Sequence, residues 1–99
     1  MGPFDKITGF DRDKGNEQKN AKHGVTPAEA EQVFMNEPVI VTPDVSHSGS
    51  EQRYRALGRT NAGRQLAVIF TLRENATLFR VIYVRDMHRK ERAIYEQEA

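Results

Sequence analysis

The feature that most constrains the fold is a two-residue alternation that starts at Arg53 and runs through the second half of the chain. Side chains of a β-strand point alternately to its two faces, so this period predicts strands. In the first strand one face carries Tyr54, Ala56 and Gly58, and the other carries Arg53, Arg55, Leu57 and Arg59. Asn61-Ala62-Gly63 then predicts a hairpin loop, in which glycine supplies a positive φ.

Two further strands are expected after this hairpin. The segment from Gln65 to Leu72 is apolar enough to be a central strand, and Arg73-Glu74-Asn75-Ala76 predicts a second turn. The segment from Thr77 to Arg85 predicts another strand. A strict alternation in this strand places on one side Leu78, Arg80, Ile82 and Val84.

The first half of the chain contains the clearest helix signal. Thr26-Pro27-Ala28-Glu29 is a capping box with proline at the first helical position, and Asn36-Glu37-Pro38 ends the helix. Within it an inward face is formed by Ala30, Val33 and Phe34. The β-branched run Val39–Thr42 predicts a strand. A short helix is expected at 15–22, with Gly24 as its C-cap, and a C-terminal helix at 87–98.

Together these elements predict an α+β fold in a single domain of residues 1–99. We expect an antiparallel β-sheet of about four strands, with the N-terminal helices and the C-terminal helix packed on one face. Residues 1–9 are expected to be a loose arm or a short edge strand, because they contain Gly2, Pro3 and Gly9.

Composition limits where the protein acts and what chemistry it uses. The chain has no cysteine, so disulfides, thiolate nucleophiles and zinc-thiolate sites are excluded. No apolar run approaches the roughly 20 residues that span a bilayer. The start from Met1 to Asp13 has neither the basic nor the apolar region of a signal peptide. The sequence therefore predicts a cytoplasmic protein with no membrane partner.

Charge is distributed unevenly along the chain. Residues 1–50 carry five Lys or Arg and eight Asp or Glu, whereas residues 51–99 carry ten and six. Nine of those ten basic residues are arginine, whose planar guanidinium pairs bidentately with phosphate. A basic half suits a polyanion or an acidic protein partner, and a merely solvated surface is the alternative.

The segment Lys19-Asn20-Ala21-Lys22-His23-Gly24-Val25 places two ammonium groups and an imidazole within five residues. Lys19 and Lys22 share a helix face if residues 15–22 are helical. An imidazole titrates near neutral pH, so His23 can serve as a general base or acid. The alternatives are a solvated lysine face and a histidine that caps a helix or lies at the surface. With the arginines, the segment suggests a surface that holds phosphate and moves a proton.

Several motifs resemble the BrnT-type toxins. In the first half the motifs similar to the family are Phe10-Asp11-x-Asp13-x-Gly15-Asn16, Lys19-Asn20, Lys22-His23-Gly24-Val25 and Ala28-Glu29-Ala30-Glu31-x-Val33-Phe34. In the second half they are Asp44-x-x-His47-x-x-x-Glu51-x-Arg53, Leu57-Gly58-Arg59-Thr60-x-x-Gly63-Arg64-x-Leu66, Arg80-Val81-Ile82 through Arg85, then Met87 and Arg89-Lys90-Glu91-Arg92-x-x-Tyr95. The likeness covers about residues 10–96. Two positions depart from the family pattern. Arg12 stands where a tryptophan is usual, and Tyr83-Val84 precede Arg85 where a serine and a small residue are common.

The resemblance implies a RelE-like fold and a toxin that cleaves RNA without the ribosome. It also implies a ribbon-helix-helix antitoxin of the BrnA type that holds the toxin in check, with DNA contacted only through that antitoxin. The lost tryptophan at Arg12 removes a possible stacking platform for a base, which can weaken the nuclease while antitoxin binding survives. The alternative is thus a non-catalytic or attenuated module that binds its antitoxin.

RNA cleavage without a metal needs a base for the 2′-hydroxyl, cations for the developing phosphorane charge, and an acid for the leaving 5′-oxygen. The candidate catalytic residues are Lys22, His23, Glu51, Arg53, Arg64 and Arg85. Glu51 is a candidate base and Arg53 a phosphate ligand, although a simple ion pair is the alternative. Strand arginines also protect sheet edges against aggregation.

Further RNA contacts are expected from Arg12, Lys19, Arg89 and Arg92. Arg89 and Arg92 lie three apart on the final helix and suit either RNA or an acidic antitoxin segment. Asp44, His47 and Glu51 lack the spacing of a metal framework, so neither a metal nor another cofactor is predicted. Plain nucleic-acid binding by the sheet is a third hypothesis, but no strand is rich in aromatic residues.

Overall fold

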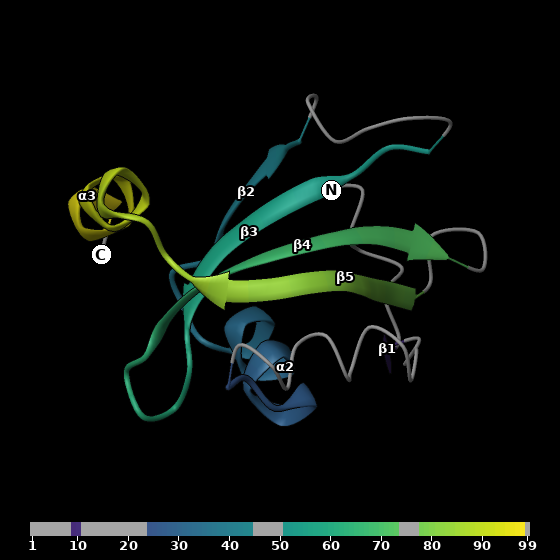
Figure 1. Ribbon diagram of the computed structural model, residues 1–99, viewed down its shortest axis with the longest axis horizontal. Coiled ribbons are helices and arrows are strands. Elements are labelled where there is room, and N and C mark those ends of the chain that lie inside the picture. Colours follow the sequence, from purple (N-terminus) through teal and green to yellow (C-terminus); the bar gives the residue numbers. More distant parts are fainter. Residues whose placement is uncertain (1–8, 11–23, 45–50, 74–77, 99) are drawn as a thin grey trace.

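The computed structural model of the chain describes residues 9–10, 24–44, 51–73 and 78–98. Its elements are β1 (Gly9–Phe10), α2 (Pro27–Met35), β2 (Ile40–Pro43), β3 (Tyr54–Arg59), β4 (Gln65–Arg73), β5 (Leu78–Asp86) and α3 (Arg89–Glu98). The strands form one sheet in the order β1-β5-β4-β3-β2, with α2 and α3 beside it (Figure 1). The predicted α+β class is confirmed.

The sheet differs from the predicted one in strand number and direction. It has five strands rather than about four, and it is mixed, because β1 pairs parallel to β5 while the other neighbours are antiparallel. In β1, Gly9 pairs with Leu78 and Phe10 pairs with Phe79. A short edge strand is one of the two alternatives expected for residues 1–9, and Gly9 does lie in an edge strand. A strand of two residues is too short to show an alternation, so periodicity could not place it. The helix expected at 15–22 lies outside the described residues.

The capping box predicted before α2 is confirmed. The Thr26 hydroxyl accepts a hydrogen bond from the Glu29 backbone N–H at 3.1 Å, and the Glu29 carboxylate accepts one from the Thr26 backbone N–H at 3.0 Å. Two N–H groups at the helix start are thereby satisfied. The helix turns its buried residues, Ala30 and Val33, toward the sheet and ends at Asn36. The local sequence alone therefore fixes where α2 begins and ends.

The two helices lie against opposite faces of the sheet, so the prediction that they share a face is wrong (Figure 1). Ala56 of β3 belongs to the core beside α2, whereas its neighbour Leu57 packs with Tyr95 of α3. Adjacent residues of a strand point to opposite faces, so these two contacts separate the helices. Neither helix of the described part of the chain is long and apolar enough to cross a membrane.

The core between the sheet and α2 is rich in aromatic rings. Its buried residues are Val25, Ala30, Val33, Ala56, Leu66, Val68, Phe70, Phe79 and Val84. Phe34 stacks on Phe79 with ring centroids 4.3 Å apart, and Phe70 meets both rings edge-on at 5.1 Å. Phe10 of β1 extends this group, with its centroid 5.5 Å from that of Phe79. We call the side of the sheet that carries this core the aromatic face.

Gly58 lets α2 approach β3 closely. A Cβ atom at this position would lie 2.7 Å from Val33 Cγ1 and 3.0 Å from the Val33 carbonyl oxygen. Real side chains do not tolerate the first of these distances, so a glycine is required where the helix crosses the strand. The hairpin predicted at residues 61–63 is also confirmed, because Gly63 has a φ of 88°.

A bulge in β5 overturns the strict alternation predicted there. Ile69 pairs with Tyr83, but the next residue, Phe70, pairs with Val81, so Ile82 has no partner in β4. The extra residue reverses the phase of the strand. Val84 consequently joins Val81 on the aromatic face. The alternation had predicted that Val84 shares a side with Leu78 and Arg80, and this prediction is wrong.

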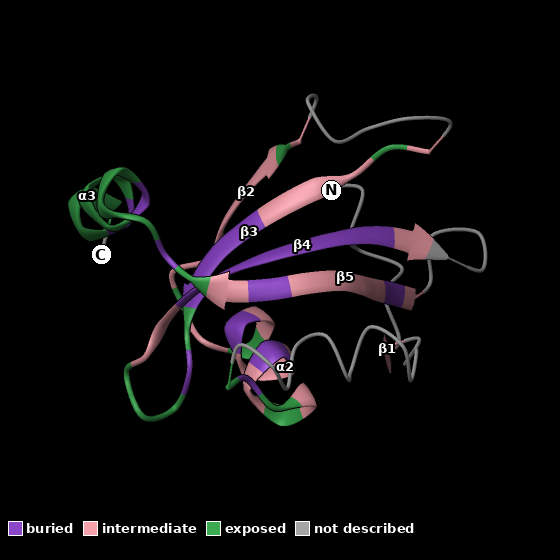
Figure 2. Ribbon diagram, viewed as in Figure 1, coloured by how far each residue is buried: buried purple, intermediate pink, exposed green. Residues whose placement is uncertain are grey.

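The C-terminal helix starts two residues later than predicted. The Met87 backbone N–H donates to the Gln65 carbonyl at 3.1 Å and so continues the sheet ladder, while the Met87 side chain is buried. Tyr95 packs the helix to the sheet, as predicted, and its hydroxyl donates to the Pro38 carbonyl at 2.8 Å. Figure 2 shows the contrast in burial, since β4 is largely buried whereas α3 is mostly exposed.

Candidate functional site

Arginine side chains from two strands lie together on the sheet side opposite the aromatic face. Arg55 pairs with Ile69 across β3 and β4, and Ile69 pairs with Tyr83 of β5, so these three residues form one row. Directly opposite residues of paired strands point to the same side. Arg85 pairs with Ala67 and Arg80 with Thr71, on the same side of β4 as Ile69. Arg53 lies just before β3, but the ladder with β2 reaches it, because the Asp44 backbone N–H donates to the Arg53 carbonyl at 2.8 Å, and Arg53 therefore extends this side of the sheet.

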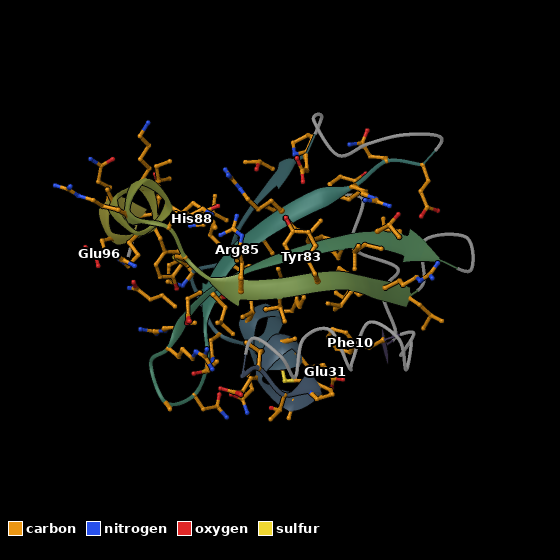
Figure 3. The ribbon with its side chains drawn as sticks, viewed as in Figure 1. Phe10, Glu31, Tyr83, Arg85, His88 and Glu96 are labelled. Carbon is orange, nitrogen blue, oxygen red and sulfur yellow. The ribbon has the colours of Figure 1, made fainter. Side chains whose placement is uncertain are left out.

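We define the arginine face by Arg53, Arg55, Arg80, Tyr83 and Arg85. Figure 3 shows Tyr83 and Arg85 rising from β5 on one side of the sheet, while Phe10 and Glu31 lie on the side of α2. The helix α3 lies near one end of the arginine face, where Leu57, Ala67, Met87 and Tyr95 form a second, smaller core.

Glu91 of α3 is bound by two arginines of this face. The Arg85 guanidinium makes a bidentate contact with it, from Nη1 to Oε1 at 2.6 Å and from Nη2 to Oε2 at 3.0 Å. Arg55 Nη1 donates to Oε2 at 3.2 Å, and the His88 backbone N–H donates to Oε1 at 2.8 Å. Each carboxylate oxygen therefore accepts two hydrogen bonds, which uses the four acceptor sites of the group.

The charge state of Glu91 follows from these contacts. Burial alone would raise the pKa of Glu91, because its side chain is only 6% exposed. The hydrogen bonds from Arg85 and the His88 N–H, with the charges of Arg85 and Arg55, instead lower the pKa from its ordinary value of 4.5 to about 2. Glu91 is therefore a carboxylate at neutral pH, and it orients both arginines.

Arg85 keeps its charge for the same reason. Its hydrogen bond to Glu91 raises the pKa of the guanidinium, burial lowers it, and the nearby Tyr83 side chain raises it by a smaller hydrogen-bonding contribution. The Arg85 and Arg55 side chains remain 22% and 34% exposed. Both side chains thus remain partly open to solvent, although Glu91 fixes the position of each guanidinium.

Arg64 belongs to a different cluster, on the other side of the sheet. Its guanidinium binds Asp86 through Nε at 2.8 Å and Nη2 at 3.1 Å, and Nη1 lies 3.5 Å from Glu29. Asp86 pairs with Leu66, a residue of the aromatic face, whereas Arg85 points the opposite way. The structure thus brings Arg53 and Arg85 to one face and leaves Arg64 outside it.

This second cluster also binds the backbone of Gly24. Arg64 Nη1 donates to the Gly24 carbonyl at 2.7 Å, and Gly24 has a φ of 70°. The hydrogen bond from Arg64 is the main cause that lowers the pKa of Asp86, and the backbone N–H of Thr26 does the same for Glu29. Both carboxylates are therefore ionised at neutral pH, and Arg64 is held between them.

Of the remaining predicted site residues, some lie within the described part of the chain and others do not. Arg12, Lys19, Lys22 and His23 lie outside the described residues. Glu51 is half-buried at a bend, and β3 begins at Tyr54, so the alternation that placed Glu51 beside Arg53 does not reach it. Arg89 and Arg92 are exposed on α3, and Arg92 Nη1 donates to the Met87 carbonyl at 2.9 Å. Their roles stay predictions.

Asp44, His47 and Glu51 are the side chains weighed in the sequence as metal ligands, although their spacing predicts no metal site. His47 lies outside the described residues, whereas Asp44 and Glu51 are within them. Among the residues that the structure describes, no group of three His, Asp or Glu side chains has the proximity of a metal site.

Sequence reasoning missed three residues of the arginine face and the carboxylate that orients it. Arg55 had a usable signal, since the alternation that selected Arg53 also placed Arg55 on the same side. Tyr83 had a signal too, since it lies two residues before Arg85. Arg80 had none, because only the bulge at Ile82 brings it to the same side as Arg85. Glu91 lies thirty-six residues from Arg55 in the chain, so no local pattern connects the two.

The structure defines a small α+β protein whose sheet gathers arginine side chains on one face, and guanidinium groups are the side chains best suited to pair with phosphate. The chain belongs to the family of BrnT ribonuclease toxins of type II toxin–antitoxin systems, whose family model matches residues 10–91. A toxin of this kind has RNA as its substrate and an antitoxin as its partner. No curated protein matches the sequence.

Proposed function

We propose that this BrnT toxin is a metal-independent endoribonuclease that cleaves RNA on the arginine face and thereby inhibits translation and growth. The observation that carries the proposal is the convergence of Arg55 and Arg85 from two strands onto one buried carboxylate. Their exposed edges face the same side as Arg53 and Arg80. A RelE-like fold and a cytoplasmic location belong to the same proposal.

The arginines supply what the transition state of RNA cleavage requires. Attack of a 2′-hydroxyl on the neighbouring phosphate builds negative charge on the phosphoryl oxygens. A guanidinium held in place beforehand stabilises that charge without reorganising during the reaction. Arg85 is fixed by its bidentate contact with Glu91, and Arg55 is held by the same carboxylate. We assign to these two arginines, with Arg53, the grip on the scissile phosphate.

Proton transfer falls to other residues than Glu91. With a pKa of about 2 and both oxygens occupied, Glu91 is a poor proton acceptor at neutral pH, so it serves as a positioning residue. Lys22, His23 and Glu51 are the proposed base and acid.

The partner in this proposal is a ribbon-helix-helix antitoxin of the BrnA type, through which alone the pair contacts DNA. Arg89 and Arg92 are exposed on α3 and offer cations to RNA or to an acidic antitoxin segment. The test of this part is co-purification with a ribbon-helix-helix protein from the adjacent reading frame. Absence of a complex between the two purified proteins would contradict it.

The enzyme proposal is tested with purified protein, single-stranded RNA and a chelator of divalent cations. We expect cleavage that leaves 2′,3′-cyclic phosphate ends. Arg85→Ala should lower the rate by about 100-fold or more, because it removes a transition-state cation. Arg59→Ala is the matched control, since Arg59 is an exposed arginine of the same sheet that donates to the Glu37 carbonyl at 2.9 Å. Its rate should stay near that of the unmodified protein.

Inducible expression separates an active toxin from an attenuated one. We expect growth arrest with the unmodified chain. Arrest seen only with Arg12→Trp, together with RNA cleavage by that variant alone, would support attenuation at Arg12. If neither form cleaves RNA while the antitoxin complex remains intact, the chain is a binding module and the enzyme proposal is wrong.

A further inference from the structure

The aromatic side chains of the described residues are distributed unevenly over the molecule. Five of them, Phe10, Phe34, Tyr54, Phe70 and Phe79, form the ring contacts of the aromatic face. Tyr95 is 1% exposed and its hydroxyl is bound to Pro38. Tyr83 is the remaining aromatic residue of the described chain, and it is half-buried among arginines. Core packing therefore accounts for the other six rings but not for Tyr83.

The position of Tyr83 relates it to the phosphate-binding groups. Tyr83, Ile69 and Arg55 occupy one row across β5, β4 and β3, so the outer two are separated by two strand spacings, or roughly 10 Å. Arg85 lies two residues along β5 and points to the same side (Figure 3). Tyr83 and Arg85 pair with Ile69 and Ala67, which are themselves two residues apart on β4, so the two side chains leave the sheet in adjacent rows.

We propose that Tyr83 is a stacking platform for one nucleobase of the bound RNA, next to the phosphate held by Arg55 and Arg85. This inference rests on the proposed function and adds a base subsite to it. A flat aromatic ring beside cations is the combination with which proteins hold single-stranded RNA, because every base has a face that stacks. The platform selects unpaired RNA, since a base within a duplex is already stacked on its neighbours.

The bulge at Ile82 adds Arg80 to this subsite. Tyr83 and Arg85 are two residues apart, but Arg80 lies three residues before Tyr83 and would point away from it in a regular strand. The extra residue places Arg80, Tyr83 and Arg85 on one side. The ring thus has a cation on either side along its own strand.

The test measures binding of short single-stranded RNA with 2′-O-methyl riboses, which lack the attacking hydroxyl and stay intact. Tyr83→Leu keeps an apolar side chain but removes the ring, and we expect affinity to fall roughly tenfold. Tyr83→Phe keeps the ring and should bind within about twofold of the unmodified protein. Urea unfolding of each variant checks that the fold is unchanged.

A series of oligonucleotides with one abasic position each makes the assignment specific. One abasic position should weaken binding to the unmodified protein by roughly tenfold, and the same position should cost Tyr83→Leu almost nothing further. An equal loss at that position in both proteins would overturn the platform. So would unchanged RNA affinity in Tyr83→Leu combined with a weakened antitoxin complex, because the ring would then be a protein contact.

The proposed function fails in a different way. If the unmodified protein neither binds nor cleaves RNA, the enzyme proposal and the base subsite are both wrong. If it binds and cleaves RNA, and Tyr83→Leu does so equally well, only the subsite is wrong.

Discussion

The two faces of the sheet use the same strands for different purposes. On the aromatic face, Phe70 and Val84 are fully buried against α2 and its neighbours. The next residues along these strands, Thr71 and Arg85, point to the arginine face. There the charge of Arg85 is paired with the carboxylate of Glu91. The comparison shows that adjacent residues of a strand serve different faces, with buried apolar packing on one and paired charges on the other. The predictions below test that division.

The largest effect is expected from truncating the aromatic face. Phe70→Ala removes a fully buried ring that meets Phe34 and Phe79 edge-on and stacks on Tyr54. We expect the free energy of unfolding to fall by about 3–5 kcal/mol, measured by urea denaturation. Arg80→Ala on the opposite face is the control, with a loss below about 1 kcal/mol and weaker RNA binding. Similar losses of stability from Phe70→Ala and Arg80→Ala would contradict the view that the aromatic face contributes most of the stability.

The free energy of unfolding should depend on pH through the carboxylates at the two helix starts, and most strongly through Glu91. The pKa of Glu91 is about 2 in the folded protein, below its ordinary 4.5, so the unfolded chain binds the proton more readily. The stabilisation is complete above about pH 5 and is lost as pH falls toward 2. It amounts to at most about 3 kcal/mol. Glu91→Gln should therefore be less stable than the unmodified protein at pH 6, and this difference should shrink at pH 3.

Glu29 is the matched control, because it caps α2 from the same position as Glu91 caps α3. Its pKa is also lowered, chiefly by the Thr26 backbone N–H, but Glu29 is more exposed and lies beside a single arginine. Glu29→Gln should show a smaller pH-dependent difference. If the unfolding free energies of the unmodified protein and Glu91→Gln depended on pH in the same way, the arginines would not be holding that carboxylate in its charged form.

A third prediction probes how closely the aromatic face packs. Gly58→Ala brings a methyl group to 2.7 Å from Val33 Cγ1, and we expect a loss of about 1–3 kcal/mol in unfolding free energy. In a Val33→Ala background the loss should be smaller by roughly 1 kcal/mol, since one of the two clashing groups is gone. Gly63→Ala is the control, because its cost arises from positive φ and is independent of Val33. Additive effects of Gly58→Ala and Val33→Ala would rule out the clash.

The smallest effect is expected at the exposed Arg64 cluster. The Asp86 side chain is 62% exposed, so Asp86→Asn should reduce the unfolding free energy by less than about 1 kcal/mol. The difference from the unmodified protein should decrease at high salt, because salt screens exposed charges. A large effect that does not depend on salt would show that Arg64 and Asp86 hold the fold together as Glu91 and Arg85 do.

Local sequence signals predicted local structure well. The capping box at Thr26, the hairpin at Gly63 and the alternation of residues 53–59 are all confirmed, because each depends on residues close together in the chain. The candidate site was predicted less completely. Arg53 and Arg85 do share a face, but Arg64 lies elsewhere. Its partner Asp86 points to the opposite side of the sheet, and this residue is twenty-two positions away, so no local pattern shows the contact.

By itself, the sequence determined the elements, the alternation of apolar and charged residues in β3, and the wealth of arginine in the second half. Tertiary structure decided the pairing of β1 with β5, the placing of the helices on opposite faces, and the bulge at Ile82 that gathers Arg80, Tyr83 and Arg85. The physical reason is range. Caps and turns are set by energies within a few residues, whereas strand register and ion pairs depend on segments that meet only when the chain has folded.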